Sequence, residues 1–399
     1  MFGLPSWLLF IPVVGFLIFI HEFGHFATAK FFRIRVLEFG FGFPPRIFGI
    51  PFKGTIYSVN WLPLGGFVRF VGEEDPTDPD SLARHSVFRR AVVLVAGSFM
   101  NLLLPVIIVT ILLMVPHDVL SGGDVLITGV APGSPAREAG LRRGDMILAA
   151  EGERVRTPGD LVDIVRDRRG DAVELSVRRG ALVTGLGSSP EYSVVDAVTL
   201  VPRFSSPDMK VVGTVTDPTT QASLAEARRY DSRLEIGDTI TQSYIGVMIG
   251  IANPRIEEVS EPIWEAVPNS FSTIWDILVF TKEGFVEGLS RGDNPGLAGP
   301  IGIAQATGEG VDEFGFNWIW QLMVLISLSL GIMNLLPIPA LDGGRLVFVL
   351  LEWVRRGKRI SPRREGISHL VGFAALIGFV FFMSYFDIVR IVSGESLIR

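Results

Sequence analysis

The segment His21-Glu22-Phe23-Gly24-His25 has the spacing HExxH, two histidines four residues apart with a glutamate directly after the first. On a helix, residues four apart lie on one face, so both imidazoles can reach one metal ion. Zinc lowers the pKa of a water ligand towards neutrality, and Glu22 is placed to take the proton of that water. The pattern predicts metal-assisted hydrolysis of a peptide bond, with His21 and His25 as ligands and Glu22 as general base.

Zinc bound by two histidines needs a third protein ligand. The chain has no cysteine and five histidines, so thiolate ligands are excluded and the site must be built from histidine and carboxylate. His85, His117 and His369 lack ligand spacing and are expected in loops or at span ends. A pair of buried structural histidines is the alternative for His21 and His25, but such groups in an apolar segment are costly unless they bind something.

The elements that must position the motif are apolar enough to cross a membrane. The chain has 399 residues, 48% of them hydrophobic and 20% charged, with a mean hydropathy of +0.42. Four stretches reach the roughly 20 uncharged residues that cross about 30 Å of hydrocarbon: 1–20, 91–115, 316–341 and 366–386. A cleaved signal peptide is the alternative for the first, which lacks a basic start and a small-residue cleavage site. We expect a multi-pass α-helical membrane protein with transmembrane helices at 1–32, 91–116, 316–344 and 366–390.

The basic residues predict the orientation. Segment 30–90 holds nine Lys and Arg against six acids, and segment 345–366 holds seven against two. By the positive-inside rule both segments are cytoplasmic, which places both chain ends and the 117–315 region outside. The net charge of -6 and the lack of a basic stripe do not suggest a nucleic-acid partner.

Asp342 is the candidate third ligand. It follows Asn334 in the sequence NLLPIPALDGG, which ends the third apolar stretch. The first and third spans both enter from outside, so Asp342 and the HExxH pair reach the same cytoplasmic-side depth. The prolines break the helix there, which a membrane tolerates only where the freed backbone lines a protein cavity. A cap-and-turn role for Asp342 is the alternative.

Segment 33–90 is expected to form a membrane-associated β-hairpin and a cytoplasmic loop. Residues 33–70 are rich in Phe, Ile, Val, Gly and Pro and predict short strands separated by turns, with the turn-rich linker EEDPTDPDS after them. Strand edges cannot face lipid unpaired, so the hairpin should be covered by protein. A hairpin in the cytosol is the alternative.

The region 124–253 resembles a PDZ-like α/β domain. Strand-like alternation from Asp124 is followed by a short helix at 135–139, a GLRRGD turn, a helix capped by Thr157 and a strand in DAVELSVRR. A polar insertion is expected at about 180–243, with a returning strand at 244–247. Such a domain binds peptide termini by adding a strand to a sheet edge.

Residues 262–290 have apolar residues at helical spacing but also several charges. These charges argue against a fifth span and favour an amphipathic helix in the outer membrane interface. A core helix of the external domain is the alternative.

Together, HEFGH in the first span, NLLPIPALDGG in the third and a PDZ-like domain between the second and third spans resemble the site-2 protease family of intramembrane zinc metalloproteases. The branch most similar is the bacterial regulator of sigma-E proteases. WLPLGGFVRF and LAGPIGIA at 297–304 extend the resemblance. It implies that His21, His25 and Asp342 bind Zn²⁺ and that Glu22 is the base.

The resemblance also implies roles for two asparagines and a class of substrate. Asn334 would contact the substrate backbone or the developing oxyanion, and Asn101 would steady the site, with plain interhelix hydrogen bonding as its alternative. The expected substrates are transmembrane segments of single-span proteins, either an anti-sigma factor or signal-peptide remnants, in the bacterial plasma membrane. The PDZ-like domain would act as a size filter, although relatives often carry two such domains.

Two other classes of protein are alternatives to a protease. A non-catalytic membrane scaffold that presents a PDZ domain to external peptides has no reason to keep Glu22. A metal transporter fits poorly, because four spans show no internal repeat and a PDZ-like domain interrupts them.

Overall fold

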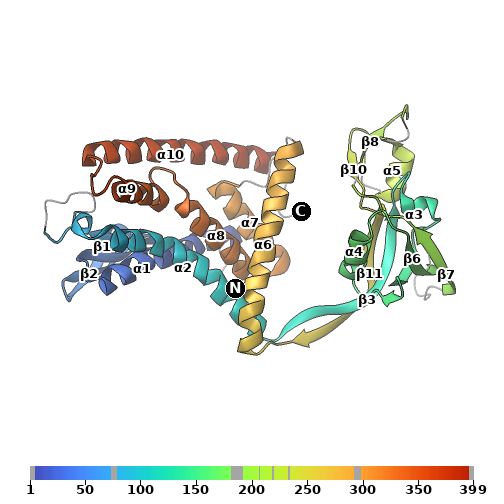
Figure 1. Ribbon diagram of the computed structural model, residues 1–399, viewed down its shortest axis with the longest axis horizontal. Helices are drawn as coiled ribbons and strands as arrows, with labels where there is room; N and C mark the ends of the chain where they lie inside the picture. Colours follow the sequence, from blue (N-terminus) through green and yellow to red (C-terminus); the bar gives the residue numbers. More distant parts are fainter. Residues whose placement is uncertain are drawn as a thin grey trace. The chain divides into compact units, whose positions relative to one another are not determined.

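The computed structural model describes residues 5–72, 79–180, 192–205, 207–217, 220–231, 234–291 and 298–394. The chain divides into two compact units (Figure 1). Met1–Val115 and Ser260–Arg399 form a helical unit, and Pro116–Val259 form a β-rich unit. Each is described by itself.

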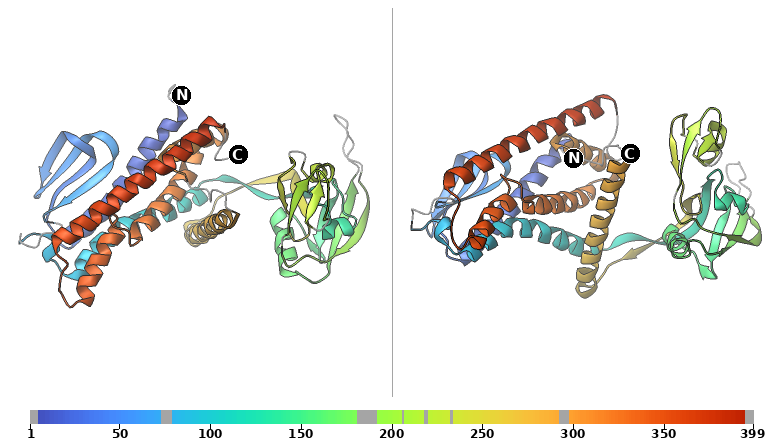
Figure 2. Two further views of the ribbon diagram at one scale, coloured as in Figure 1. Left: turned by 90° about the horizontal axis from the view of Figure 1, so that it is seen from above. Right: turned by 45° about the horizontal axis from the view of Figure 1, so that its top comes forward.

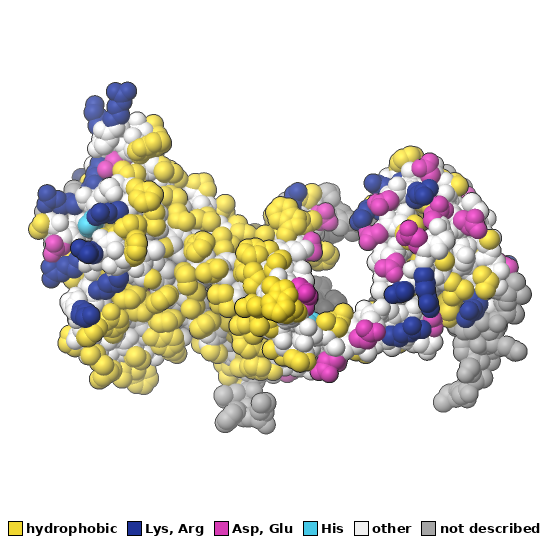
Figure 3. All heavy atoms as spheres, turned by 60° about the horizontal axis from the view of Figure 1, so that its bottom comes forward, with side chains coloured by type: hydrophobic (Ala, Val, Ile, Leu, Met, Phe, Trp, Pro, Cys, Tyr) yellow, Lys and Arg dark blue, Asp and Glu magenta, His cyan; other side chains and the backbone are white. Residues whose placement is uncertain are grey.

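The helical unit contains the apolar stretches. Its helices are η1 (Ser6–Leu9), α1 (Phe10–Phe31), η2 (Leu82–Arg84), α2 (Val87–Met114), α6 (Ile263–Arg291), α7 (Pro300–Phe314), α8 (Trp318–Leu335), α9 (Asp342–Val354) and α10 (Pro362–Val392). Within the described part of the chain, four helical stretches are long and apolar enough to cross a membrane: Ser6–Phe31, Val87–Met114, Trp318–Leu335 and Pro362–Val392. Each overlaps one of the four stretches expected from the sequence, and apolar side chains cover much of the face of this unit drawn in Figure 3.

The expected third transmembrane helix at 316–344 is wrong at its C-terminal end. α8 ends at Leu335, residues 336–341 are not helical, and Asp342 begins the separate helix α9. Pro337 and Pro339 lack a backbone N–H, and each disfavours helical geometry in the residue before it. Asp342 therefore does not lie on the apolar helix that precedes it.

The segment after α1 forms the hairpin expected there. Its strands are β1 (Val36–Phe52) and β2 (Thr55–Phe70), joined at Lys53 and Gly54, which both have positive φ. Residues 38–41 pair with 66–69 on one side and with 56–59 on the other, while 48–52 pair with 55–59. The pairing thus gives four short strand segments, as the turn-rich sequence predicted. Among the described residues, segment 66–70 has a strand neighbour on one side only.

Glycines bring this hairpin sheet and α2 close to α1 (Figure 2). A Cβ at Gly15 would lie 2.8 Å from the carbonyl oxygen of Pro63 on β2, and one at Gly24 would overlap the carbonyl oxygen of Ala96 on α2. Since neither glycine has a side chain, the neighbouring backbones can approach the helix that carries HExxH.

Helix α6 crosses the direction of α2 and α8 in the helical unit (Figures 1 and 2). The Glu261 N–H donates to the carbonyl oxygen of Leu113 at the end of α2, and buried residues four apart share one face of α6, Ala266, Ser270 and Ile274. Large aromatic side chains elsewhere on the helix are exposed, including Trp264, Phe271 and Trp275. The expected amphipathic helix at 262–290 is confirmed as a helix, and its place in the membrane interface remains a prediction.

The β-rich unit contains two sheets. Its strands are β3 (His117–Val130), β4 (Met146–Ala150), β5 (Glu153–Arg154), β6 (Val173–Gly180), β7 (Tyr192–Leu200), β8 (Asp208–Val212), β9 (Gln221–Ser223), β10 (Thr239–Thr241) and β11 (Val247–Val259). The larger sheet has the order β11-β3-β4-β6-β7, with β5 beside β4, and the smaller has the order β10-β8-β9. Helices α3 (Pro135–Glu138), α4 (Pro158–Asp167) and α5 (Leu224–Tyr230) complete the unit.

The helices expected at 135–139 and after Thr157 are confirmed as α3 and α4. Thr157 and Asp160 form a reciprocal capping box at the start of α4. The Arg156 N–H and the Thr157 hydroxyl donate to the Asp160 carboxylate and hold the pKa of Asp160 below its usual value.

The expected insertion at 180–243 needs correction. Its residues 181–191 lie outside the described part of the chain, but β7 pairs with β6 and belongs to the main sheet. The separate smaller sheet begins at Asp208. The returning strand begins at Val247 rather than at residue 244, because the Ser243 hydroxyl accepts from the N–H groups of Gly246 and Val247 and makes a turn there.

Candidate metal centre

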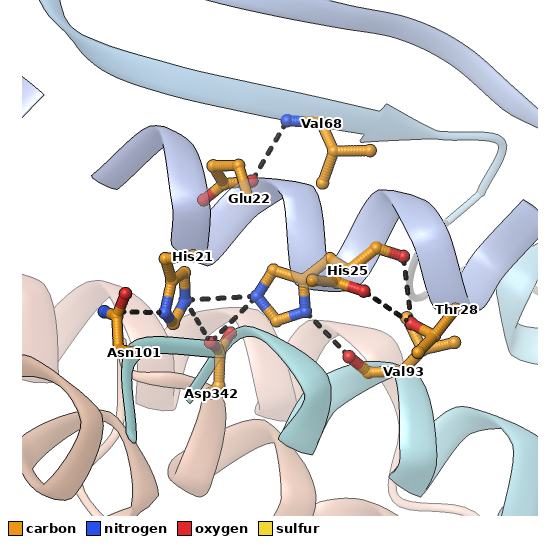
Figure 4. Close-up of polar contacts among 9 residues, drawn as sticks. His21, Glu22, His25, Thr28, Val68, Val93, Asn101 and Asp342 are labelled. Atoms are coloured by element: carbon orange, nitrogen blue, oxygen red, sulfur yellow. Dashed lines mark hydrogen bonds and ion pairs between the residues drawn. The ribbon is translucent and has the colours of Figure 1, made fainter. Parts of the chain in front are cut away.

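Helix α1 places the two histidines of HExxH on one buried face. The Nε2 atoms of His21 and His25 lie 3.1 Å apart, and the two residues are 8% and 6% exposed (Figure 4). This is the geometry that a spacing of four residues on a helix predicts. Both imidazoles point away from the hairpin sheet and towards α2 and α9.

Asp342 joins this pair from the first residue of α9. Its Oδ2 atom lies 2.9 Å from His21 Nε2 and 3.1 Å from His25 Nε2. The sequence predicted that Asp342 and the histidines meet, and the structure brings them together although Asp342 is not on the third span. Two potential ligand atoms from α1 and one from a residue more than 300 positions later form one triangle.

The triangle has a size that suits zinc. Tetrahedral zinc with ligands at 2.0–2.1 Å has ligand atoms about 3.3 Å apart, close to the 2.9–3.1 Å between these three. Gly97 of α2 faces the same atoms, and a Cβ there would overlap His25 Nε2 and approach His21 Nε2. The absence of a side chain at Gly97 therefore keeps open the space beside the two nitrogens. One histidine pair, one carboxylate and no thiolate form the donor set of a hydrolytic zinc site.

The other ring nitrogen of His25 fixes the tautomer that a metal needs. His25 Nδ1 lies 2.7 Å from the carbonyl oxygen of Val93 on α2. Because a carbonyl oxygen only accepts, Nδ1 carries the proton and donates. Nε2 then has its lone pair directed to the triangle, the arrangement common for metal-bound imidazoles.

Asn101 of α2 lies beside the other histidine. Its side-chain Nδ2 is 3.4 Å from His21 Nδ1, and its Oδ1 is buried with no hydrogen-bond partner within the described residues. Its backbone carbonyl accepts a hydrogen bond of 2.7 Å from the Ser327 hydroxyl of α8. Asn101 therefore contacts the site by its side chain and joins two candidate spans by its backbone.

Glu22 projects from α1 towards the hairpin sheet. Its Oε2 accepts a hydrogen bond of 3.0 Å from the Val68 N–H in the edge segment 66–70 (Figure 4). Glu22, His21 and His25 nevertheless each place one potential ligand atom within 4.8 Å of the others. The carboxylate is thus held by a strand edge while it remains next to the histidine nitrogens.

A cavity of about 250 Å³ opens beside these groups and is lined by Glu22, His25 and Asp342 together with residues of β2, α2 and α9. Arg90 also lines it and forms an ion pair of 2.6 Å with Glu352 of α9. This pair joins α2 to the helix that begins with Asp342. The cavity has room for water and for part of a peptide backbone.

His85 lies between η2 and α2, and His117 begins β3. His369, in contrast, does not behave as a simple span-end residue. Its Nδ1 accepts a hydrogen bond of 2.9 Å from the Ala340 N–H, two residues before Asp342. No local spacing indicates this contact, which needs α10 to pack on the loop. Asn334, a predicted substrate contact, is half-buried and makes no side-chain hydrogen bond among the described residues.

The chain is similar to known zinc metalloproteases over nearly all of its length. The family model described as peptidase family M50 matches residues 9–379. A putative zinc metalloprotease of Brucella suis is 29% identical over 396 residues, covering 95% of this chain and 94% of the relative. The zinc metalloprotease RasP of Geobacillus kaustophilus is 26% identical, with 96% and 98% covered. A putative zinc metalloprotease of Fusobacterium nucleatum is 28% identical, with 96% and 98% covered.

Among solved structures, the PDZ domain of an SdrC-like protein from Listeria monocytogenes matches 19% of this chain and 70% of that domain, at 22% identity and a TM-score of 0.14. That likeness is too weak to carry an argument about the β-rich unit. The family match, in contrast, spans nearly the whole chain. The chain belongs to peptidase family M50, the site-2 proteases, and is a membrane protein and a zinc metalloprotease with Zn²⁺ as its cofactor.

Proposed function

We propose that this protease is an intramembrane endopeptidase that cuts the transmembrane segments of membrane-anchored, single-span proteins. The observation that carries the proposal is the position of the triangle. His21 and His25 lie on a helix apolar enough to cross a membrane, and Asp342 lies within 3.1 Å of both. A peptide bond that reaches these atoms belongs to a chain that has entered the protein from the bilayer.

His21, His25 and Asp342 would hold the zinc ion, and Glu22 would act as the base. Zn²⁺ held there would act as a Lewis acid, polarising the peptide carbonyl and making water more acidic. Glu22 takes a proton from the attacking water and passes it to the leaving nitrogen, so the broken C–N bond ends as a carboxyl group and an amine. The Val68 N–H fixes Oε2 of Glu22 and leaves the other carboxylate oxygen for this transfer.

The hairpin sheet supports a way to present the substrate. A helical peptide bond is shielded by its own hydrogen bonds, so the substrate must unwind before it is cut. Segment 66–70 is an edge whose Val68 N–H already donates to Glu22. A substrate that extends the sheet at this edge would place its backbone beside the catalytic carboxylate.

Asn101 would hold His21 as the Val93 carbonyl holds His25. If His21 Nε2 binds zinc, its Nδ1 carries a proton and needs an acceptor. Turning the Asn101 amide by 180° offers Oδ1, which has no hydrogen-bond partner among the described residues, to that N–H. We expect Asn101→Ala to weaken zinc binding about 10- to 100-fold, while Asn101→Asp, which can only accept, keeps it. Equal zinc affinities in competition with a chelator for wild type and Asn101→Ala would refute this role.

The β-rich unit would recognise the part of a substrate outside the membrane. The order of α3, α4 and the strands supports a PDZ-like domain that binds peptide termini, as the sequence predicted. Lys and Arg gather at one end of the helical unit in Figure 3. By the positive-inside rule this end would be cytoplasmic, with the β-rich unit and both termini outside the plasma membrane.

Anti-sigma factors and signal-peptide remnants are the two proposed substrate types.

The experiment that tests the function is cleavage of purified single-span reporters, each prepared with and without a folded external domain. We expect cleavage within the span, loss of cleavage on zinc removal by a chelator, and recovery on adding Zn²⁺. A size filter predicts that reporters without the external domain are cut faster. Cleavage only outside the span would refute the intramembrane assignment.

In the same assay, Asn334→Ala should slow cleavage with zinc content unchanged, and wild-type rates would remove Asn334 from the site.

A further inference from the structure

We propose that His369, on α10, is a positioning residue that holds Asp342 in the zinc triangle. The inference rests on Asp342 being a zinc ligand, as proposed above. α8 ends at Leu335, and the non-helical residues 336–341 separate it from Asp342. The contacts that fix this loop therefore fix the carboxylate relative to the histidines of α1.

The backbone just before Asp342 has a conformation that needs support. Ala340 has a φ of +86°, in the left-handed region that favours glycine. A residue other than glycine stays in this backbone conformation only where contacts with the surrounding structure hold it there. Here the Ala340 N–H donates a hydrogen bond of 2.9 Å to His369 Nδ1.

The same face of α10 also packs closely against Pro339, the loop residue before Ala340. Gly372 lies three residues after His369, on one face of the helix, and is buried. A Cβ at position 372 would overlap the carbonyl oxygen of Pro339. A hydrogen bond and a close backbone approach thus act on two successive loop residues, Ala340 and Pro339.

The imidazole of His369 also reaches the helix that Asp342 begins. Its ring centroid lies 5.4 Å from that of Phe348 on α9. Because Nδ1 accepts from an amide, the ring is in the tautomer with its proton on Nε2. His369 therefore contacts the chain on both sides of Asp342 and links the ligand to α10.

The second attachment of α10 lies elsewhere and provides a comparison. The buried residues of α10 are Gly372, Met383 and Asp387. The Asp387 carboxylate accepts a hydrogen bond of 2.8 Å from the Gly302 N–H of α7. Loss of this contact would loosen α10 without touching the loop before Asp342.

The test is the rate at which purified full-length protein releases zinc to a chelator. We expect His369→Leu, which has no acceptor, to release zinc about tenfold faster, near the lower end for loss of a group that orients a ligand. His369→Asn should restore slow release, because Oδ1 of asparagine can accept at the position of Nδ1. Leu370→Ala, at an exposed neighbour on α10, and Asp387→Ala, which removes the acceptor for the Gly302 N–H, should both release zinc at the wild-type rate.

Three results would overturn the proposal: wild-type release from His369→Leu, release from His369→Asn as fast as from His369→Leu, or release from Asp387→Ala as fast as from His369→Leu. If His369→Leu does not fold, Gly372→Ala replaces it, with faster release expected and the wild-type rate as the contrary result. A wild type without zinc, or Asp342→Asn with full zinc, would refute the ligand set itself. The outcomes thus separate failure of the ligand set from failure of this inference.

Discussion

Glu22→Gln is expected to abolish cleavage of a single-span reporter while the protein keeps its zinc. The glutamine retains the shape of the side chain and an oxygen that accepts from the Val68 N–H. It cannot take a proton from water. Loss of a general base slows hydrolysis by about 10²- to 10⁴-fold, and the three proposed zinc ligands are untouched. Cleavage of the reporter and zinc content are measured on the same preparation.

The control for this variant is Glu283→Gln, the same change at an exposed position on α6. It should cleave at the wild-type rate and contain as much zinc as the wild type. Glu22→Gln protein that cleaves the reporter at the wild-type rate would remove Glu22 from the reaction. If the protein were a non-catalytic scaffold, none of the three proteins would cleave the reporter. Cleavage by the wild type therefore distinguishes a protease from a scaffold.

The pair of histidines could be predicted from local spacing because a helix converts a separation of four residues into one face. Helices α3 and α4 could also be predicted from local sequence, because their capping residues directly precede them in the chain. The four apolar stretches follow from length and composition alone. These features depend on short segments of chain, and the structure contains each of them, although the third apolar helix ends at Leu335, before the expected end.

Asp342 could be predicted as a partner but not placed correctly. The prolines indicated a broken helix, yet the sequence does not show that a new helix begins at Asp342 itself. The contact of His369 with Ala340 could not be predicted, because it depends on two segments that meet at Gly372 and no spacing along the chain indicates that they meet. The pairing of Tyr192–Leu200 with β6 could not be predicted for the same reason, because the alternation that indicates a strand does not show which strand it pairs with.

Loss of a proposed ligand should remove zinc from the protein. In Asp342→Asn the anionic oxygen between the two Nε2 atoms becomes part of a neutral amide, a weaker ligand for zinc, and His21→Ala removes one imidazole outright. Each variant should bind zinc more than about 100-fold more weakly, because even an outer partner of a ligand contributes 10- to 100-fold. Metal analysis after dialysis, with chelator competition for the affinity, measures the loss, and cleavage should fall with zinc content.

The matched control is His85→Ala, which removes an imidazole from a position outside the triangle and should leave zinc and cleavage unchanged. Asp342→Asn and His21→Ala should both lose zinc, because the Asp342 carboxylate lies 2.9 Å from His21 Nε2 and one ion would contact both residues. Zinc retained by Asp342→Asn but lost from His21→Ala would mean that the histidines bind metal without α9, and the third ligand would have to be sought elsewhere. Zinc lost from both ties α1 and α9 to one ion, so the apolar helix that carries Glu22 and the loop held by α10 would form a single catalytic centre.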